Sequence, residues 1–232
     1  MRFNSFGNSV NISVNLKAME TEIMQNSHPK YSNSIRELLK FGPVTLDNPM
    51  STIDFYHFHQ ALPDLLMERD KHGRVTIMSP VKKGSGKRES LLQIIIGMWV
   101  LETGLGEIYS PSTGIELPDS SIKSPDLAWI SDEKLAQLPE NADEEFLKVV
   151  PDFVVEIRSS SDSLKKLQEK MTEVWMANGV NLGWLIDPYS ERVWIYREGQ
   201  EPEIVKEFVN RELSGETVMP GMVFPLEKMR VE

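Results

Sequence analysis

The sequence predicts an α/β fold in which helices pack against a central mixed β-sheet. From residue 50 onward, short apolar runs of strand length alternate with longer segments of helical periodicity. The chain has 232 residues, of which 40 % are hydrophobic and 26 % are charged, so it can bury one sizeable core. No repeat or low-complexity tract interrupts residues 50–232. These elements are therefore expected to form one domain.

Four segments carry the start and stop signals of helices. Ser51 can cap the first, and Pro63 stops it. A small glycine-bearing loop at 84–86 precedes the second. Gly179 ends the fourth, in the position that favours a left-handed cap. The predicted helices cover residues 51–61, 87–103, 132–138 and 163–178.

Six segments have the composition of strands, with turn-forming residues between them. Asp119–Ser121 and Asp187-Pro188 are expected to be two of these turns. The tail after residue 200 is expected to form one or two edge strands, because Gly215, Pro220 and Gly221 interrupt it. The predicted strands cover residues 74–78, 107–117, 124–130, 153–157, 183–186 and 192–196.

Two further expectations concern the order of the N-terminal residues and the cellular location of the protein. Residues 1–45 are rich in Asn and Ser and have little periodicity, so a weakly ordered extension is expected before a domain at 46–232. The longest apolar run, 91–101, is shorter than the roughly 20 residues of a membrane span. The N-terminus lacks a hydrophobic signal core, and the chain has no cysteine. A cytoplasmic protein without disulfides or cysteine-bound zinc is expected.

The formal net charge of −10 argues, by itself, against nucleic-acid binding, which depends on neutralising phosphates. Two basic clusters oppose this argument, although each can also be an ordinary solvated face: one at 82–88 and one at 165–166. A bound divalent cation would also reverse the charge around an acidic site. Binding to nucleic acid therefore remains open on charge alone.

The segment PDFVVEIRSS holds Asp152 and Glu156 on one predicted strand. Alternation puts both on one face, but at about 3.4 Å per residue they are roughly 13 Å apart. A cation holds its oxygen ligands at about 2.0 to 2.6 Å. Asp152 is therefore expected to cap or turn the chain before the strand, and not to share a metal ion with Glu156.

A second Pro-Asp pair occurs upstream, in SIKSPDLAWI, where Asp126 begins another predicted strand. If the two strands are neighbours in the sheet, the carboxylates of Asp126 and Glu156 can converge. The alternative is equally compatible with the spacing: Glu156 forms a structural ion pair with Arg158 or with another cation.

The lysine best placed to reach these carboxylates lies on the predicted helix at 163–178. Arg158 stays protonated and cannot act as a base. At about 100° per residue, Lys170 falls at the border of the apolar stripe of the predicted helix, whereas Lys165 and Lys166 point further away. The simpler explanation is that Lys170 only extends its stem along the helix edge. The stripe consists of Leu164, Leu167, Met171, Val174 and Trp175.

Three segments, in this order, resemble a known family: SPDLAWIS, PDFVVEIRSSSDSLKKLQEKM and NGVNLGWLIDP. They are similar to the Uma-type family of putative restriction endonucleases, within the PD-(D/E)XK nuclease superfamily. The segments MERDKHGRVTIMSP and LSGETVMPGMVFPL extend the likeness to roughly residues 50–226. The resemblance implies a restriction-endonuclease-like core, with a central mixed sheet flanked by helices.

The resemblance also implies the site residues and the reaction. Asp126 matches the first acid, Glu156 the second, and Lys170 in QEKM the lysine, which in this family lies on the helix. Mg²⁺ or Mn²⁺ would be held by the two acids and a main-chain carbonyl, that of Ile157, for DNA phosphodiester hydrolysis.

One position departs from the family. Many relatives carry a glutamate after the MSP segment, where Gly84 stands here. Glu89 can substitute, the position can be vacant, and Glu68 is a further acid in a matching segment. A homodimer is compatible with cutting both strands of DNA. Two alternatives stay open: a non-catalytic nucleic-acid or protein binding module with the same fold, and a phosphodiesterase or hydrolase of small nucleotides.

Overall fold

The computed structural model describes residues 10–12, 35–46, 48–139 and 145–231, which form two compact units. The first unit comprises Met1–Pro80 with Asp119–Lys123, and the second comprises Val81–Pro118 with Ser124–Glu232. The predicted extension, residues 1–45, lies mostly outside the described residues, so its order stays a prediction.

The described part of the first unit contains a small sheet and a helix of 10 residues. Its strands follow the order β1-β2-β4-β3-β7, in which β1 and β2 are parallel and the other neighbours are antiparallel. The helix α3, Thr52–Ala61, begins where predicted, because the Ser51 hydroxyl accepts a hydrogen bond from the Asp54 amide at 3.1 Å. Residues 35–39 are also helical. The strands are β1 Val10–Ile12, β2 Val44–Leu46, β3 Met67–Arg69, β4 Val75–Ile77 and β7 Ile122–Lys123.

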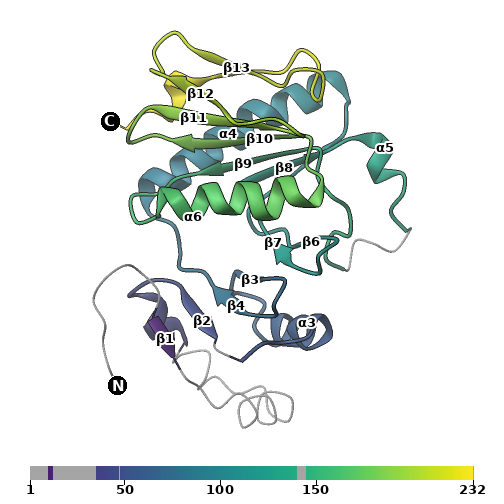
Figure 1. Ribbon diagram of the computed structural model, residues 1–232, viewed down its shortest axis with the longest axis vertical. Coiled ribbons are helices and arrows are strands. Elements are labelled where there is room, and N and C mark those ends of the chain that lie inside the picture. Colours follow the sequence, from purple (N-terminus) through teal and green to yellow (C-terminus); the bar gives the residue numbers. More distant parts are fainter. Residues whose placement is uncertain (1–9, 13–34, 47, 140–144, 232) are drawn as a thin grey trace. The chain divides into compact units, whose positions relative to one another are not determined.

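The second unit is built on a mixed sheet with the strand order β12-β11-β10-β9-β8-β5. β9 and β10 run parallel, and the other neighbouring pairs are antiparallel. Figure 1 shows this sheet between α4 and α6. The strands are β5 Glu107–Tyr109, β8 Leu127–Ile130, β9 Phe153–Ile157, β10 Leu182–Asp187, β11 Arg192–Arg197 and β12 Glu203–Lys206.

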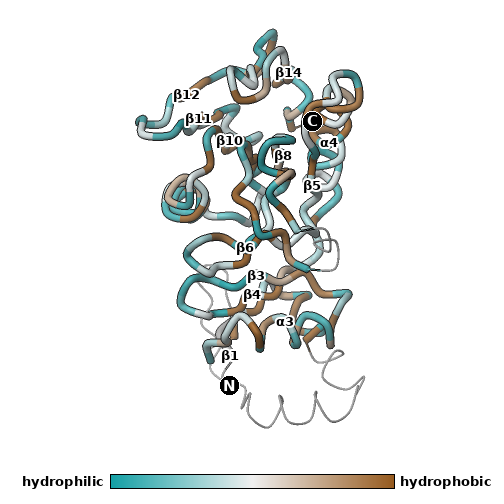
Figure 2. The backbone as a smooth tube through the Cα atoms, turned by 90° about the vertical axis from the view of Figure 1, so that its right-hand side faces the viewer, coloured by the Kyte–Doolittle hydropathy of each residue, from teal (hydrophilic) through white to brown (hydrophobic). Residues whose placement is uncertain are grey.

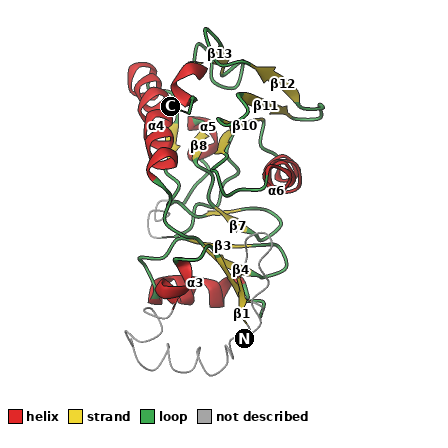
Figure 3. Ribbon diagram, turned by 90° about the vertical axis from the view of Figure 1, so that its left-hand side faces the viewer, coloured by secondary structure: helices red, strands yellow, loops and turns green. Residues whose placement is uncertain are grey.

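Helices cover both faces of this sheet, as Figure 3 shows for α4 and α6. On the α4 side, Leu92 and Ile96 pack with Phe153 and Val155. On the α6 side, Val154 belongs to a second apolar cluster. Because both faces are covered, a central strand such as β8 is buried along its whole length. Figure 2 shows hydrophobic residues, in brown, among the strands of this sheet. The fold class predicted from the sequence, a mixed sheet flanked by helices, is confirmed.

The remaining elements complete the second unit. The β13–β14 hairpin lies on the α4 side, where Phe224 joins the apolar cluster. Ile115, the first residue of β6, forms an isolated parallel bridge with Leu147. These elements are β6 Ile115–Glu116, α5 Asp132–Leu135, β13 Glu212–Ser214, β14 Val223–Pro225 and the 3₁₀ helix Leu226–Met229.

Four predicted boundaries were wrong. The helix predicted at 132–138 ends at Leu135, and the strand predicted at 124–130 begins at Leu127. The helix α4 spans Lys83–Thr103 and takes in the predicted loop at 84–86. Tertiary contacts hold this first turn, because the buried Arg88 donates to the Gly84 carbonyl at 3.0 Å and to the Met229 carbonyl at 3.1 Å. The predicted strand 107–117 is two strands, since a turn closes at Thr113, whose amide donates to the Ser110 carbonyl.

The predicted helix at 163–178 exists, but it is not α-helical throughout. The α-helix α6, Leu164–Glu169, continues as a π-helical turn at Lys170–Trp175 and a 3₁₀ turn at Met176–Asn178. Gly179 ends it with a φ of 96°, in the predicted left-handed conformation. The strand β9 has the predicted bounds.

Candidate active site

Two carboxylates lie opposite each other where β8 begins and β9 ends. The strands pair antiparallel, with Leu127 opposite Val155. The same register, extended by one residue, sets Asp126 opposite Glu156. Cβ atoms of such opposite residues are about 4.5 to 5.5 Å apart. Asp126 Oδ2 also accepts a hydrogen bond from the Ile157 amide at 2.6 Å, so its side chain lies against β9.

Both carboxylates lie on the face of the sheet that α6 covers. Alternation places Asp126 with Ala128, and Glu156 with Val154. Both alanine and valine belong to the apolar cluster on the α6 side. Glu156 is 4 % exposed. A carboxylate so deeply buried requires hydrogen bonds or a cation, because burial alone disfavours its charge.

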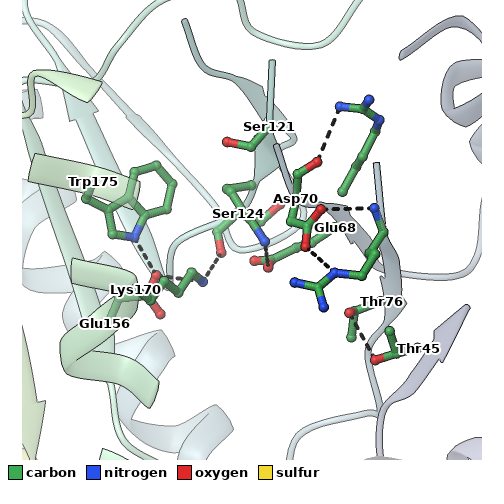
Figure 4. A network of polar contacts seen from close by, with 12 residues as sticks. Thr45, Glu68, Asp70, Thr76, Ser121, Ser124, Glu156, Lys170 and Trp175 are labelled. Carbon is green, nitrogen blue, oxygen red and sulfur yellow. Dashed lines mark hydrogen bonds and ion pairs between the residues drawn. The ribbon is translucent and has the colours of Figure 1, made fainter. Parts of the chain in front are cut away.

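Glu156 receives two donors on one oxygen, as Figure 4 shows. Lys170 Nζ lies 2.7 Å from Glu156 Oε1, and Trp175 Nε1 donates to the same atom at 2.8 Å. Lys170 Nζ also donates to the Ser124 carbonyl at 3.3 Å. Lys170 therefore leans from the helix toward the sheet, where its ammonium compensates the buried charge of Glu156.

The electrostatics around Asp126 favour a proton or a cation. Burial raises the pKa of Asp126 well above its usual range, and the nearby charge of Glu156 raises it further. The hydrogen bond from the Ile157 amide and the charge of Lys170 lower this pKa, but they do not cancel the increase. Two carboxylates that repel each other are an arrangement that a divalent cation would stabilise.

The two further acids named from the sequence have different surroundings. Glu89, on α4, is half-buried; burial raises its own pKa, and its charge contributes to the raised pKa of Asp126. Glu68, on β3, forms an ion pair with Lys123 at 3.0 Å. By the register of β3 and β7, Lys123 is its cross-strand neighbour. Glu89 is therefore the acid that acts electrostatically on Asp126.

Asp152 makes its contacts just before β9 begins, as expected from its spacing. Its Oδ2 accepts a hydrogen bond from the Ser131 amide at 2.8 Å, and its Oδ1 pairs with Lys134 at 2.9 Å. These contacts tie the start of β9 to the first turn of α5. Asp152 is thus engaged away from the Asp126–Glu156 pair.

Arg158 pairs with an acid on the neighbouring strand, and not with Glu156. Its guanidinium lies 3.0 Å from Asp187 Oδ2, and its Nε donates to the Asp162 carbonyl at 3.2 Å. Although burial alone would raise the pKa of Asp187, hydrogen bonds from Ser190, from the Tyr189 amide and from Arg158 lower it. Arg158 therefore holds the loop after β9 against the end of β10.

Residues 55–227 match a protein family described as "Uma2: Putative restriction endonuclease". The chain belongs to this family. The match spans more than half of the sequence and includes Asp126, Glu156 and Lys170.

The fold of this Uma2 protein is similar to that of a solved relative. A crystal structure of "a putative nuclease belonging to DUF820" from Anabaena variabilis superposes with a TM-score of 0.64 at 19 % sequence identity. The alignment covers 78 % of this chain and 97 % of that one. Among curated proteins, none matches the sequence significantly. Within the described residues, no helix is both long and apolar enough to cross a membrane.

The acidic side chains of the site are oxygen donors of the kind that bind hard cations. In the described ranges, no group of three His, Cys, Asp or Glu residues lies so that it could hold one. Asp126 and Glu156 form a pair of neighbouring carboxylates in this Uma2 protein. Carboxylate oxygens suit Mg²⁺, which is commonly bound through one or two carboxylates and keeps several waters. The pair therefore fits such an ion.

One polar contact of the site, that of Trp175, was not predicted from the sequence. Trp175 was assigned only to the apolar stripe of the helix, yet its indole N–H contacts Glu156. A signal existed, because the N–H of a buried tryptophan usually requires a hydrogen-bond partner. A buried glutamate on a neighbouring strand is such a partner. The sequence could not show which of the five tryptophans would make this contact.

Proposed function

We propose that this Uma2 protein is an endonuclease that hydrolyses phosphodiester bonds of DNA with Mg²⁺ or Mn²⁺. The observation that supports it most is the placement of Asp126 opposite Glu156, with Lys170 reaching the same carboxylate from the helix. Two acids can hold a divalent cation, and a lysine can offset developing charge, so these groups suit metal-assisted hydrolysis. The family description, restriction endonuclease, agrees with this reaction.

Each residue has a separate role in the proposal. Asp126 and Glu156 would hold the cation, and the Ile157 amide keeps the Asp126 carboxylate in place. A bound Mg²⁺ would supply a water of lowered pKa and would stabilise charge on the phosphate. Lys170 would orient the attacking water, help to remove its proton and offset the developing charge.

The test is cleavage of plasmid and single-stranded DNA by the purified protein with Mg²⁺ or Mn²⁺. Asp126→Asn and Glu156→Gln should each reduce cleavage by about 100-fold or more, because each removes a charged ligand of the cation. Asp152→Asn is the matched control and should cut nearly as well as the wild type, since Asp152 contacts Ser131 and Lys134 instead. Equal loss in Asp152→Asn, with an unchanged circular dichroism spectrum, would contradict the choice of Asp126.

A homodimer belongs to this proposal. Cutting both strands of a duplex is simplest with two sites related by a two-fold axis. Light scattering of the purified protein, with and without duplex DNA, measures this state. A monomer that cuts only one strand of a plasmid would show that a single site acts alone.

A second function has one observation in its favour. Lys170 and Trp175 already satisfy Glu156 Oε1, as they would in a purely structural network. Together with the net charge of −10, this favours a non-catalytic binding module that keeps the nuclease fold. The cleavage experiment separates the two, because a binding module cuts no DNA with any cation.

A further inference from the structure

Two donors reach one oxygen of Glu156 although they lie five residues apart on one helix. In an α-helix, residues five apart diverge by about 140° around the axis. Between Lys170 and Trp175, however, the chain forms a π-helical turn, whose hydrogen bonds join residues five apart. Trp175 therefore follows Lys170 by one π turn, and both side chains point to Glu156 Oε1 (Figure 4).

Specific contacts accommodate this unusual turn. The amide of Met176 is shared between the carbonyl of Met171, five residues earlier, and that of Thr172, four residues earlier. The Thr172 hydroxyl donates to the Gln168 carbonyl at 3.0 Å, a contact that often bends helices. On β10, Gly183 leaves room for the side chain of Met171, whose methyl carbon would lie 2.5 Å from a Cβ at that position. Both the backbone and the packing thus fit a π turn at this place.

We propose that Trp175 is a positioning residue for Glu156, and that the π turn serves to bring Trp175 and Lys170 to the same carboxylate oxygen. The inference rests on the proposed function, since a carboxylate held in one orientation matters for binding a cation. The ammonium of Lys170 supplies charge but sits on a flexible stem. The Trp175 indole is completely buried and donates in one fixed direction, so it determines how the carboxylate is turned.

The chain offers a matched control for removing this donor. Trp184 is also completely buried, but its Nε1 has no hydrogen-bond partner in the described part of the chain. Trp175→Phe and Trp184→Phe remove the same atoms from two buried sites, and only Trp175→Phe removes a hydrogen bond to Glu156. Thermal melting of both variants shows whether the packing loss is comparable.

The measurement is Mn²⁺ binding by titration calorimetry without DNA, followed by DNA cleavage. Loss of a group that orients a metal ligand typically costs about 10- to 100-fold in affinity or activity. We expect a loss of this size in Trp175→Phe and wild-type values in Trp184→Phe. If both variants bind Mn²⁺ and cut DNA like the wild type, the positioning role is wrong, while the proposed function stands.

A second readout does not depend on DNA cleavage. The indole N–H resonance of Trp175, identified by its absence in Trp175→Phe, should move in Glu156→Gln and again when Mg²⁺ is added to the wild type. A resonance that stays in place on saturation with Mg²⁺ would overturn the inference. If the wild type binds no divalent cation and cuts no DNA, the proposed function fails, and the positioning role fails with it.

Discussion

Lys170 is the residue whose chemistry can best be separated from binding of the cation. Lys170→Met should reduce DNA cleavage by about 100-fold or more, because proton transfer and charge compensation contribute on this order. Mn²⁺ binding should persist, since Asp126 and Glu156 remain. Lys166→Met is the control, because Lys166 is exposed on the same helix. Cleavage assays and calorimetry on both variants measure the two properties.

Arg158, two positions after Glu156, is the alternative to Lys170 as the cationic residue of the site. Arg158→Lys should retain part of the activity, because its ion pair with Asp187 is structural and a lysine can keep some of it. If Lys170→Met cuts normally and Arg158→Met is inactive while folded, the lysine on the helix has been assigned wrongly.

The raised pKa of Asp126 predicts a pH dependence of stability. A carboxyl group with a raised pKa in the folded state binds its proton more tightly there than in the unfolded chain. The free energy of unfolding therefore falls as the pH increases from the ordinary value of about 3.9 toward the raised one. In EDTA, Asp126→Asn should melt at a higher temperature than the wild type at pH 7, and the difference should shrink toward about pH 3.5.

Divalent cations provide the matching control for this prediction. Mn²⁺ should raise the melting temperature of the wild type at pH 7, because it compensates the two carboxylates, and should have little effect on Asp126→Asn. A wild type that is already the more stable protein at pH 7 in EDTA would show that the burial of Asp126 carries no such cost.

At the level of elements, the turn before β5 has a strict requirement for glycine. Gly104 and Gly106 both have positive φ, of 68° and 62°. A Cβ at Gly106 would overlap the Ile130 carbonyl oxygen, whereas nothing lies near one at Gly104. Gly104→Ala should cost about 1 kcal/mol, and Gly106→Ala about 3 kcal/mol or more. Urea unfolding measures both, and equal losses would show that only the backbone angle matters.

At the level of the whole molecule, the net charge of −10 predicts that DNA binding depends on the cation. The inactive Lys170→Met variant should bind a labelled duplex in Mn²⁺ but not in EDTA, and the affinity should fall as salt increases. Fluorescence anisotropy measures this binding. Equal binding in EDTA would show a basic surface that works without metal, and would favour the non-catalytic function. That residues 46–232 act as one nuclease domain also stays a prediction.

The predictability of the site differs from residue to residue. The spacing of Asp152 and Glu156 on one strand was enough to separate them, because strand geometry is local. From the sequence, Asp126 and Glu156 could converge only if β8 and β9 were neighbours. The pairing of the two strands satisfies this condition. The partner of Arg158 was open in the sequence, because Asp187 belongs to another strand, 29 positions later. Trp175 was missed because its N–H partner also comes from another element.

By itself, the sequence determined the features that depend on neighbouring residues: the strand β9, the start of α3 at Ser51, the end of the helix at Gly179, and the fold class. Capping, alternation and left-handed glycine are local properties of the backbone. Only the tertiary structure decided where α4 begins and that a π turn interrupts the following helix. Contacts from distant parts of the chain, such as Arg88 with Met229 and Trp175 with Glu156, can outweigh local helix preferences of about 1 kcal/mol per residue.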